Sequence, residues 1–170
     1  MSPLTVLAVI PARYDSSRFP GKPLASICGK SMIQRVHERV ARARLPNQLL
    51  VATDDLRIAQ EVESFGGRAV MTKATHRSGS ERVAEVAATR SCDLVVNIQG
   101  DEPLIKPEAI DLAIERLLQR KEFEVSTLVT RMRNMDEVQA PGVVKVVTDI
   151  SGRAIYFSGR RFRIRAQGAE

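Results

Sequence analysis

Short apolar runs alternate with segments of helical periodicity along most of the chain, and this alternation limits the fold more than any other feature. A run that is apolar throughout is typical of a strand buried on both faces. Strands that alternate with amphipathic helices favour parallel pairing, so we predict an α/β fold with a mainly parallel sheet. Ser31 followed by Gln34 has the spacing of a capping box at a helix start. Strands are expected at residues 4–10, 48–53, 68–71, 93–98, 124–130, 142–149 and 154–158, and helices at residues 31–44, 58–65, 80–90 and from Pro107 onward.

The composition is that of an ordinary globular domain. With 170 residues, 44% of them hydrophobic, the chain is long enough for one packed core. Its apolar runs are too short to span a bilayer, and its start lacks the basic segment of a secretory signal. Cys28 and Cys92 lie far apart without metal-ligand spacing, so reduced thiols are expected. The net charge of +6 indicates an anionic partner, although residues 159–170, with four arginines against one glutamate, supply +3 of it.

In parallel α/β sheets, ligands bind beyond the carboxyl ends of the strands, so loops that follow predicted strands are candidate sites. The first, which we call the opening loop, is residues 10–24, IPARYDSSRFPGKPL. Its prolines stiffen it, and Gly21 permits close backbone approach to a ligand. Arg13, Arg18 and Lys22 can point into one crevice, which suits a polyphosphate. A solvated basic loop explains the same charges, and the glycine patterns of P-loops and dinucleotide-binding turns are absent.

Two further loops place polar residues beside predicted helix starts. In ATDD, residues 52–55, Asp54 or Asp55 is expected either to cap the next helix or to contact a base or ribose. In HRSGSER, residues 76–82, a turn of serines and glycine leads into a helix whose free N–H groups would bind an anion. An ordinary capped turn with His76 at the surface is the alternative for this third loop.

The fourth loop, NIQGDEPLI at residues 97–105, follows the most apolar predicted strand. Asp101 and Glu102 lie at the carboxyl end of that strand, where Gly100 permits a tight turn. A carboxylate there can hold Mg²⁺ against phosphate oxygens, because magnesium prefers oxygen ligands and takes few of them from protein. A simple D-E-P turn is the alternative. Cations in one loop and a carboxylate in another together favour a site for a metal-bound polyphosphate.

Together the four loops, followed by GVVKVV and AIYFS, closely resemble the 3-deoxy-manno-octulosonate (Kdo) cytidylyltransferase family, the CMP-Kdo synthetases. The resemblance runs in order from about residue 5 to Ser158. It implies a nucleotide-diphospho-sugar transferase fold, a three-layer α/β/α sandwich with a mainly parallel mixed sheet. It also implies the reaction of CTP with Kdo to give CMP-Kdo and diphosphate, with Mg²⁺, for lipopolysaccharide synthesis. A cytoplasmic homodimer without nucleic-acid or membrane partners is implied in the same way.

Residue roles follow from the resemblance, motif by motif. Arg13, Lys22 and Asp101 are implied to be catalytic, with Asp101 as the magnesium ligand. Residues implied to contact the nucleotide are Ala12, Arg13, Lys22, Thr53, Asp54, Ser78, Gly79, Arg82 and Gln99. Residues implied to contact the sugar are Arg18, Gln99 and Tyr156.

After Ser158 the sequence departs from the family pattern, which continues Y-F-S-R. Here Gly159 and RRFRIRAQGAE follow, without a hydrophobic period. We therefore expect residues 1–158 to form an incomplete cytidylyltransferase domain and residues 159–170 an atypical basic tail, from truncation or a frameshift. Impaired turnover would result, so a non-catalytic CTP-binding remnant is an alternative to the enzyme. A cytidylyltransferase for another acidic sugar is a second alternative, and a nucleic-acid binder ranks last because the aromatic residues form no stacking stripe.

Overall fold

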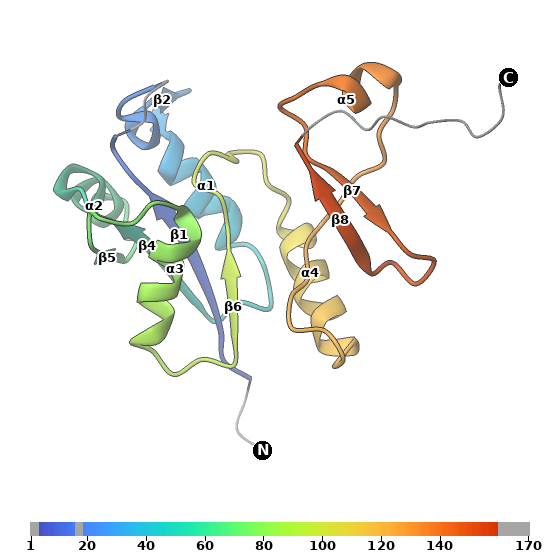
Figure 1. Ribbon diagram of the computed structural model, residues 1–170. Coiled ribbons are helices and arrows are strands. Elements are labelled where there is room, and N and C mark those ends of the chain that lie inside the picture. Colours follow the sequence, from blue (N-terminus) through green and yellow to red (C-terminus); the bar gives the residue numbers. More distant parts are fainter. Residues whose placement is uncertain (1–3, 16–18, 160–170) are drawn as a thin grey trace, which may run out of the picture. The chain divides into compact units, whose positions relative to one another are not determined.

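A computed structural model describes residues 4–15 and 19–159 and divides the chain into two compact units, residues 1–126 and 127–170 (Figure 1). In the first unit, strands and helices alternate as the sequence predicts. Its elements are β1 (Val6–Ala12), a short 3-10 helix (Lys22–Leu24), β2 (Ser26–Ile27), β3 (Lys30–Ser31), α1 (Met32–Val40), β4 (Gln48–Thr53), α2 (Leu56–Ser64), β5 (Ala69–Met71), α3 (Gly79–Ala88), β6 (Leu94–Asn97) and α4 (Pro107–Gln119).

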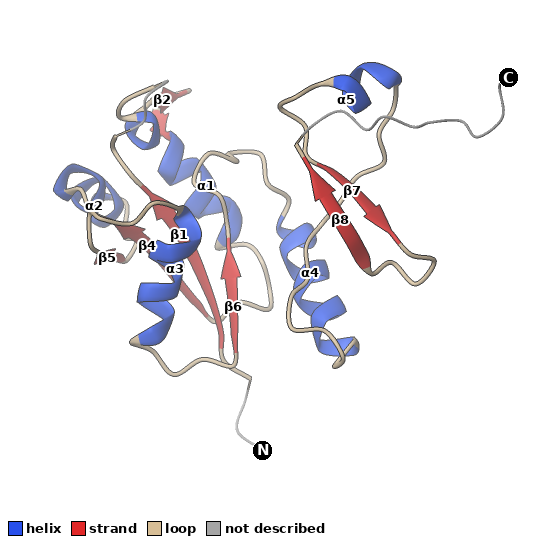
Figure 2. Ribbon diagram, in the orientation of Figure 1, coloured by secondary structure: helices blue, strands red, loops and turns tan. Residues whose placement is uncertain are grey.

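The first unit is built on a four-stranded parallel sheet in the order β5-β4-β1-β6 (Figure 2). β1 is central, and its Val9 lies opposite Leu50 of β4 on one side and Asn97 of β6 on the other. The register brings the carboxyl ends of these three strands to one edge of the sheet. In such sheets that edge is where ligands bind.

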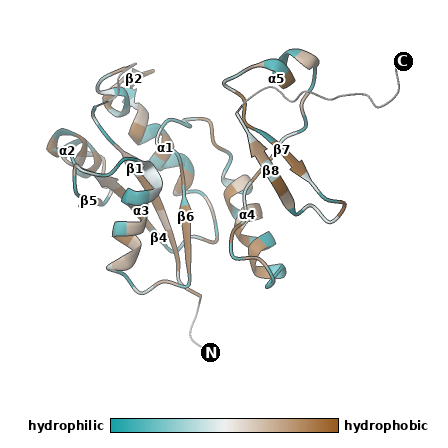
Figure 3. Cartoon of the chain, in the orientation of Figure 1, coloured by the Kyte–Doolittle hydropathy of each residue, from teal (hydrophilic) through white to brown (hydrophobic). Residues whose placement is uncertain are grey.

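Side chains of β1 alternate between two hydrophobic cores, one on each face of the sheet. Figure 3 colours β1 largely as hydrophobic. Ala8 and Ile10 pack with buried residues of α1, α2 and α4. Leu7 and Val9 pack on the opposite face with buried valines of α3. The predicted three-layer α/β/α arrangement with a mainly parallel sheet is therefore confirmed in this unit.

Element boundaries in this unit lie close to prediction, with β1 shifted from the expected residues 4–10 to Val6–Ala12, but the end of α1 differs more. Ser31 caps α1 as its capping pattern predicts, because its Oγ accepts a hydrogen bond from the amide of Gln34 at 3.2 Å. The helix was expected to continue to Arg44 but ends at Val40. Beyond it, the carboxylate of Asp111 on α4 accepts hydrogen bonds from the amides of Arg44 and Leu45, at 2.9 and 3.0 Å. These bonds satisfy amides that a longer helix would have paired internally.

The strand expected at residues 124–130 is wrong, since the structure assigns no strand there. The apolar alternation is present, but Val125 and Val129 are 82% and 61% exposed. A strand is defined by its hydrogen-bonded neighbour. Within residues 4–15 and 19–159 this segment pairs with none, and the division between the two units falls inside it.

The second unit contains α5 (Met135–Gln139) and a hairpin of β7 (Lys145–Thr148) and β8 (Ala154–Ser158). The strands pair antiparallel, which confirms the two last predicted strands. Asp149 closes the hairpin, because its Oδ1 accepts from the amides of Ser151 and Arg153, each at 2.9 Å. The expected boundary after residue 158 stays a prediction, since residues 160–170 lie outside the described part of the chain.

Among the described residues, no helix has both the length and the hydropathy needed to cross a membrane.

We expect Asp111→Ala to lower the free energy of unfolding by about 2 kcal/mol, because it leaves two backbone donors without their acceptor. Burial raises the pKa of Asp111, but hydrogen bonds from the Leu45 and Arg44 amides outweigh it and hold the pKa below its usual value. A carboxyl with a lowered native pKa stabilises the fold above its unfolded pKa, about 3.9, and this contribution disappears as the pH falls through the native value. Urea unfolding followed by circular dichroism, from pH 7 downward, measures it. The two proteins should converge in stability at low pH, and a constant difference would contradict the assignment.

Candidate functional site

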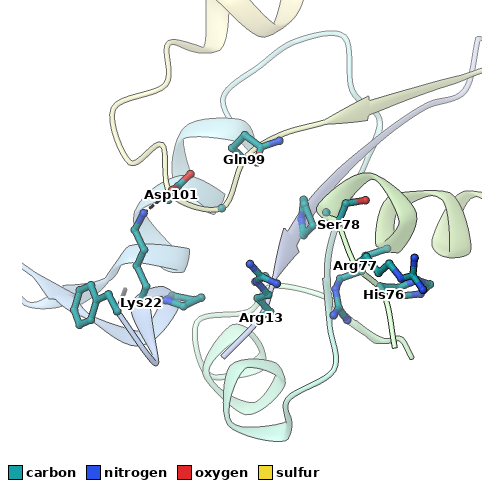
Figure 4. Close-up of a pocket in the computed structure, with 14 residues that line it drawn as sticks. Arg13, Lys22, His76, Arg77, Ser78, Gln99 and Asp101 are labelled. Atoms are coloured by element: carbon teal, nitrogen blue, oxygen red, sulfur yellow. Dashed lines mark hydrogen bonds and ion pairs between the residues drawn. The ribbon is translucent and has the colours of Figure 1, made fainter. Parts of the chain in front are cut away.

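A cleft of about 580 Å³ lies at the carboxyl edge of the sheet in the first unit (Figure 4). The opening loop, the start of α3 and the loop after β6 surround it. Three of the four loops singled out in the sequence therefore meet at one place. The lining residues are Pro11, Ala12, Arg13, Phe19, Lys22, Pro23, His76, Arg77, Ser78, Gly79, Arg82, Gln99, Gly100 and Asp101.

The opening loop is held by contacts among residues outside the cleft lining. Gly21 has a φ of 70°, which favours glycine, and its amide donates to the carbonyl of Tyr14 at 2.8 Å. The guanidinium of Arg57 lies 3.3 Å from the centroid of the Tyr14 ring, a cation–π contact. Asp55 in turn binds Arg57 through both carboxylate oxygens, at 2.9 and 2.6 Å. The backbone around Lys22 is thus fixed by the loop that follows β4.

An ion pair joins the first loop to the fourth across the cleft. Lys22 Nζ donates to Asp101 Oδ2 at 2.5 Å, and Figure 4 shows the two side chains pointing toward each other. The two side chains are 36% and 51% exposed, so a ligand can reach both. The fourth loop packs so closely on β1 that a Cβ at Gly100 would lie 2.8 Å from the carbonyl oxygen of Pro11. Only glycine allows this close approach. The approach fixes the position of the neighbouring Asp101 relative to the sheet.

The second loop, ATDD, has a structural role. Asp55 caps α2 by accepting from the amide of Arg57 at 2.9 Å, which confirms the capping interpretation. Asp54 accepts from the buried guanidinium of Arg82 at 3.0 Å, and Arg82 also donates to the hydroxyl of Thr72. Thr53 is fully buried. Thr53 and Asp54 stand outside the set of described residues that line the cleft, so their implied nucleotide contacts remain predictions.

The third loop is fixed by two carboxylates of α3. Ser78 caps this helix, and its Oγ accepts from the amide of Glu81 at 3.2 Å. The Glu81 carboxylate accepts from the amide of Arg77 at 2.8 Å. Glu85 binds the ring of His76, which holds the pKa of that carboxyl below its usual value. His76 is therefore mostly enclosed and lines the cleft, whereas the capped-turn alternative placed it at the surface.

Sequence reasoning placed most of the lining residues but not all of them. Arg18 lies outside the described residues, and Tyr156 belongs to β8 of the second unit, so the structure leaves both implied sugar contacts as predictions. Phe19, His76 and Arg77 line the cleft but were given no site role. His76 and Arg77 directly precede Ser78 in the quoted third loop, and this adjacency was the available signal. The implied residues found in the lining are Ala12, Arg13, Lys22, Ser78, Gly79, Arg82, Gln99 and Asp101.

The charges of the cleft suit a polyphosphate. Arg13, Lys22 and Arg77 line it together with the N-terminus of α3, whose free amides also favour anions. Asp101 is the carboxylate among the lining residues that the structure describes. Those described residues contain no group of three or more histidine, cysteine or acidic side chains that could enclose a metal ion. A single exposed carboxylate fits Mg²⁺ that keeps waters and is shared with phosphate oxygens.

A parallel α/β sheet with a cleft at its carboxyl edge is the arrangement of ligand-binding α/β domains. Within this class the chain belongs to the cytidylyltransferase family, whose sequence model matches residues 7–168.

The chain is similar in sequence to curated relatives over most of its length. It is 52% identical over 155 residues to a 3-deoxy-manno-octulosonate cytidylyltransferase of Geobacter metallireducens, and 54% identical to one of Pelobacter propionicus. Each match covers 91% of this chain and 61% of the relative. The chain thus spans about three-fifths of the length of these relatives.

A solved structure shares the fold over nearly the whole chain. The structure of a CMP:2-keto-3-deoxy-manno-octonic acid synthetase complexed with CTP has 41% sequence identity and a TM-score of 0.86. That match covers 92% of this chain and 64% of the other. A cytidylyltransferase from Leptospira borgpetersenii, 24% identical with a TM-score of 0.63, shares the fold.

We expect Gly100→Ala to weaken binding of magnesium tripolyphosphate about tenfold, because the added Cβ must push the fourth loop away from Pro11 and move Asp101. Gly142→Ala is the matched control, since a Cβ there meets open space. Isothermal titration calorimetry of both variants measures the effect. Equal affinities for the two variants would show that the close packing at Gly100 does not position the site.

Proposed function

We propose that this chain carries the nucleotide-binding part of a cytidylyltransferase that converts CTP and Kdo to CMP-Kdo and diphosphate with Mg²⁺. The observation that carries the proposal is the cleft itself, where Arg13 and Lys22 from the first loop meet Asp101 from the fourth. These residue types complement a metal-bound triphosphate. The similarity to a synthetase solved with CTP supports this nucleotide over others.

The reaction is a nucleotidyl transfer in which one phosphorus–oxygen bond replaces another. The anomeric hydroxyl oxygen of Kdo attacks the α-phosphorus of CTP, and the bond from that phosphorus to the β-phosphate bridging oxygen breaks. Diphosphate leaves with the bonding electrons, and the hydroxyl proton passes to solvent. Such transfers depend mainly on positioning and on stabilising charge. We assign Arg13 and Lys22 to bind and orient the triphosphate, and Ser78 and Gly79 to donate backbone amides beside it.

Asp101 is proposed to hold the magnesium ion. Its exposed carboxylate in the cleft fits a cation that arrives with the triphosphate. When bound, Mg²⁺ supplies positive charge that offsets charge on the phosphoryl oxygens. Gln99 lines the same cleft and is proposed to hydrogen-bond the nucleotide or the sugar.

Kdo is favoured over other acidic sugars because curated relatives at 52% and 54% identity are named for it. A CTP-binding protein without turnover is the second candidate. The described cleft contains residues proposed to bind the nucleotide, together with Gln99, whereas Tyr156, another implied sugar contact, belongs to the second unit. The cytoplasmic location and homodimer implied by family resemblance are part of the proposal.

We expect the chain to bind CTP in the presence of Mg²⁺, and Arg13→Ala to weaken that binding by about tenfold to a hundredfold, the size of a lost charge-assisted hydrogen bond. Arg42→Ala, which removes an exposed arginine outside the cleft lining, should bind CTP as the unsubstituted chain does. Calorimetry measures binding, and release of diphosphate on adding Kdo measures turnover.

The outcomes separate the candidates. Binding with diphosphate release supports the enzyme, and binding without release supports the non-catalytic alternative. An absence of CTP binding, or equal loss in both arginine variants, would overturn the proposed site.

A further inference from the structure

The Lys22–Asp101 ion pair joins the two groups that the proposed function assigns to opposite ligands. Lys22 is assigned to phosphate and Asp101 to magnesium, yet in the structure each neutralises the other at 2.5 Å. The two residues are 79 positions apart in sequence, so the pair is formed by the fold rather than by local geometry. Among residues 4–15 and 19–159, neither side chain has another hydrogen bond or ion pair.

We propose that this ion pair makes metal and triphosphate binding mutually dependent. The inference rests on the proposed function and concerns how the two ligands of the same site affect each other's binding. A metal ion alone must displace an ammonium group from the carboxylate that would bind it. A triphosphate alone must take Lys22 and leave Asp101 as an unpaired negative charge beside its own anions. When both ligands bind, the single Lys22–Asp101 contact is replaced by two contacts, one from Lys22 to phosphate and one from Asp101 to the metal.

Because the ion pair is exposed, ligands can reach it, and its contribution to each ligand's binding constant is small. An ion pair this exposed contributes little, at most about a factor of five in an equilibrium constant, because water and salt screen it. Ligands can therefore break it, and its cost to either ligand alone stays measurable but small. Since coupling between two sites is reciprocal, metal must raise triphosphate affinity by the same factor by which triphosphate raises metal affinity.

The ion pair can be removed without disturbing the backbone that carries Lys22. That backbone is held by hydrogen bonds from Gly21 to Tyr14, from Leu24 to Gly21 and from Ala25 to Lys22, at 2.8, 2.9 and 3.1 Å. None of these bonds uses the Lys22 side chain. Lys22→Gln is therefore expected to free Asp101 while the loop keeps its course.

Mn²⁺ is the probe, since it replaces Mg²⁺ at oxygen ligands and broadens nearby NMR signals even when it binds weakly. Broadening of the backbone amide signals of residues 99–102 is followed as Mn²⁺ is added to the full chain, with and without CTP. We expect Lys22→Gln to bind Mn²⁺ alone about threefold to fivefold more tightly than the unsubstituted chain. Lys22→Arg, which can keep the pair, should behave as the unsubstituted chain does. CTP should raise Mn²⁺ affinity more in the unsubstituted chain than in Lys22→Gln.

Arg13→Gln is the matched control because it removes the same charge from the same cleft without freeing Asp101. An equal gain in Mn²⁺ affinity in Arg13→Gln and Lys22→Gln would reduce the effect to net charge and overturn the inference. An unchanged affinity in Lys22→Gln would overturn it as well. The Mn²⁺ affinities of Lys22→Gln and Arg13→Gln are measured without CTP, so they test the ion pair independently of CTP binding. The proposed function fails separately if the unsubstituted chain does not bind CTP.

Discussion

The burial of β1 on both faces is the constraint on which the rest of the first unit depends. Its alternate side chains belong to two different cores, so the strand can only lie at the centre of a covered sheet. Parallel neighbours on each side then bring the loops after β1, β4 and β6 to one edge. The contact between Gly100 and Pro11 shows how close that approach is. The site is thus a consequence of the packing of a single apolar strand.

Features that depend on local sequence were predictable. The run QLLVAT forms β4 and AIYFS forms β8 with the expected bounds, because each run carries its own apolar pattern and turn residues. Ser31 caps α1 for the same reason. The meeting of the opening loop with the fourth loop also followed, because both loops come after predicted parallel strands, whose carboxyl ends share one edge of the sheet.

Other features that depend on a distant partner were not predictable. The segment at residues 124–130 has a strand pattern, but whether a strand forms depends on a neighbour that no local pattern specifies. The early end of α1 depends on Asp111, which lies far along the chain on α4. The enclosure of His76 depends on its contact with Glu85 of α3. That contact forms because the third loop folds back over the helix, and no local pattern specifies this fold.

Three cations, Lys22, Arg57 and Arg82, are each paired with an aspartate but fall into two groups. Arg57 and Arg82 are bound by the adjacent residues Asp55 and Asp54, so their charges are largely neutralised within the protein. The two aspartates thereby fasten the strand end of β4 to the opening loop on one side and to α3 on the other. Lys22 differs because its partner, Asp101, lies within the cleft and is itself accessible to a ligand. A ligand that supplies both an anion and a cation can replace that contact, whereas it gains nothing by breaking the contacts of Arg57 or Arg82. For these three cations, the positive charge available for binding therefore depends on which aspartate each one contacts, and net charge alone does not describe it.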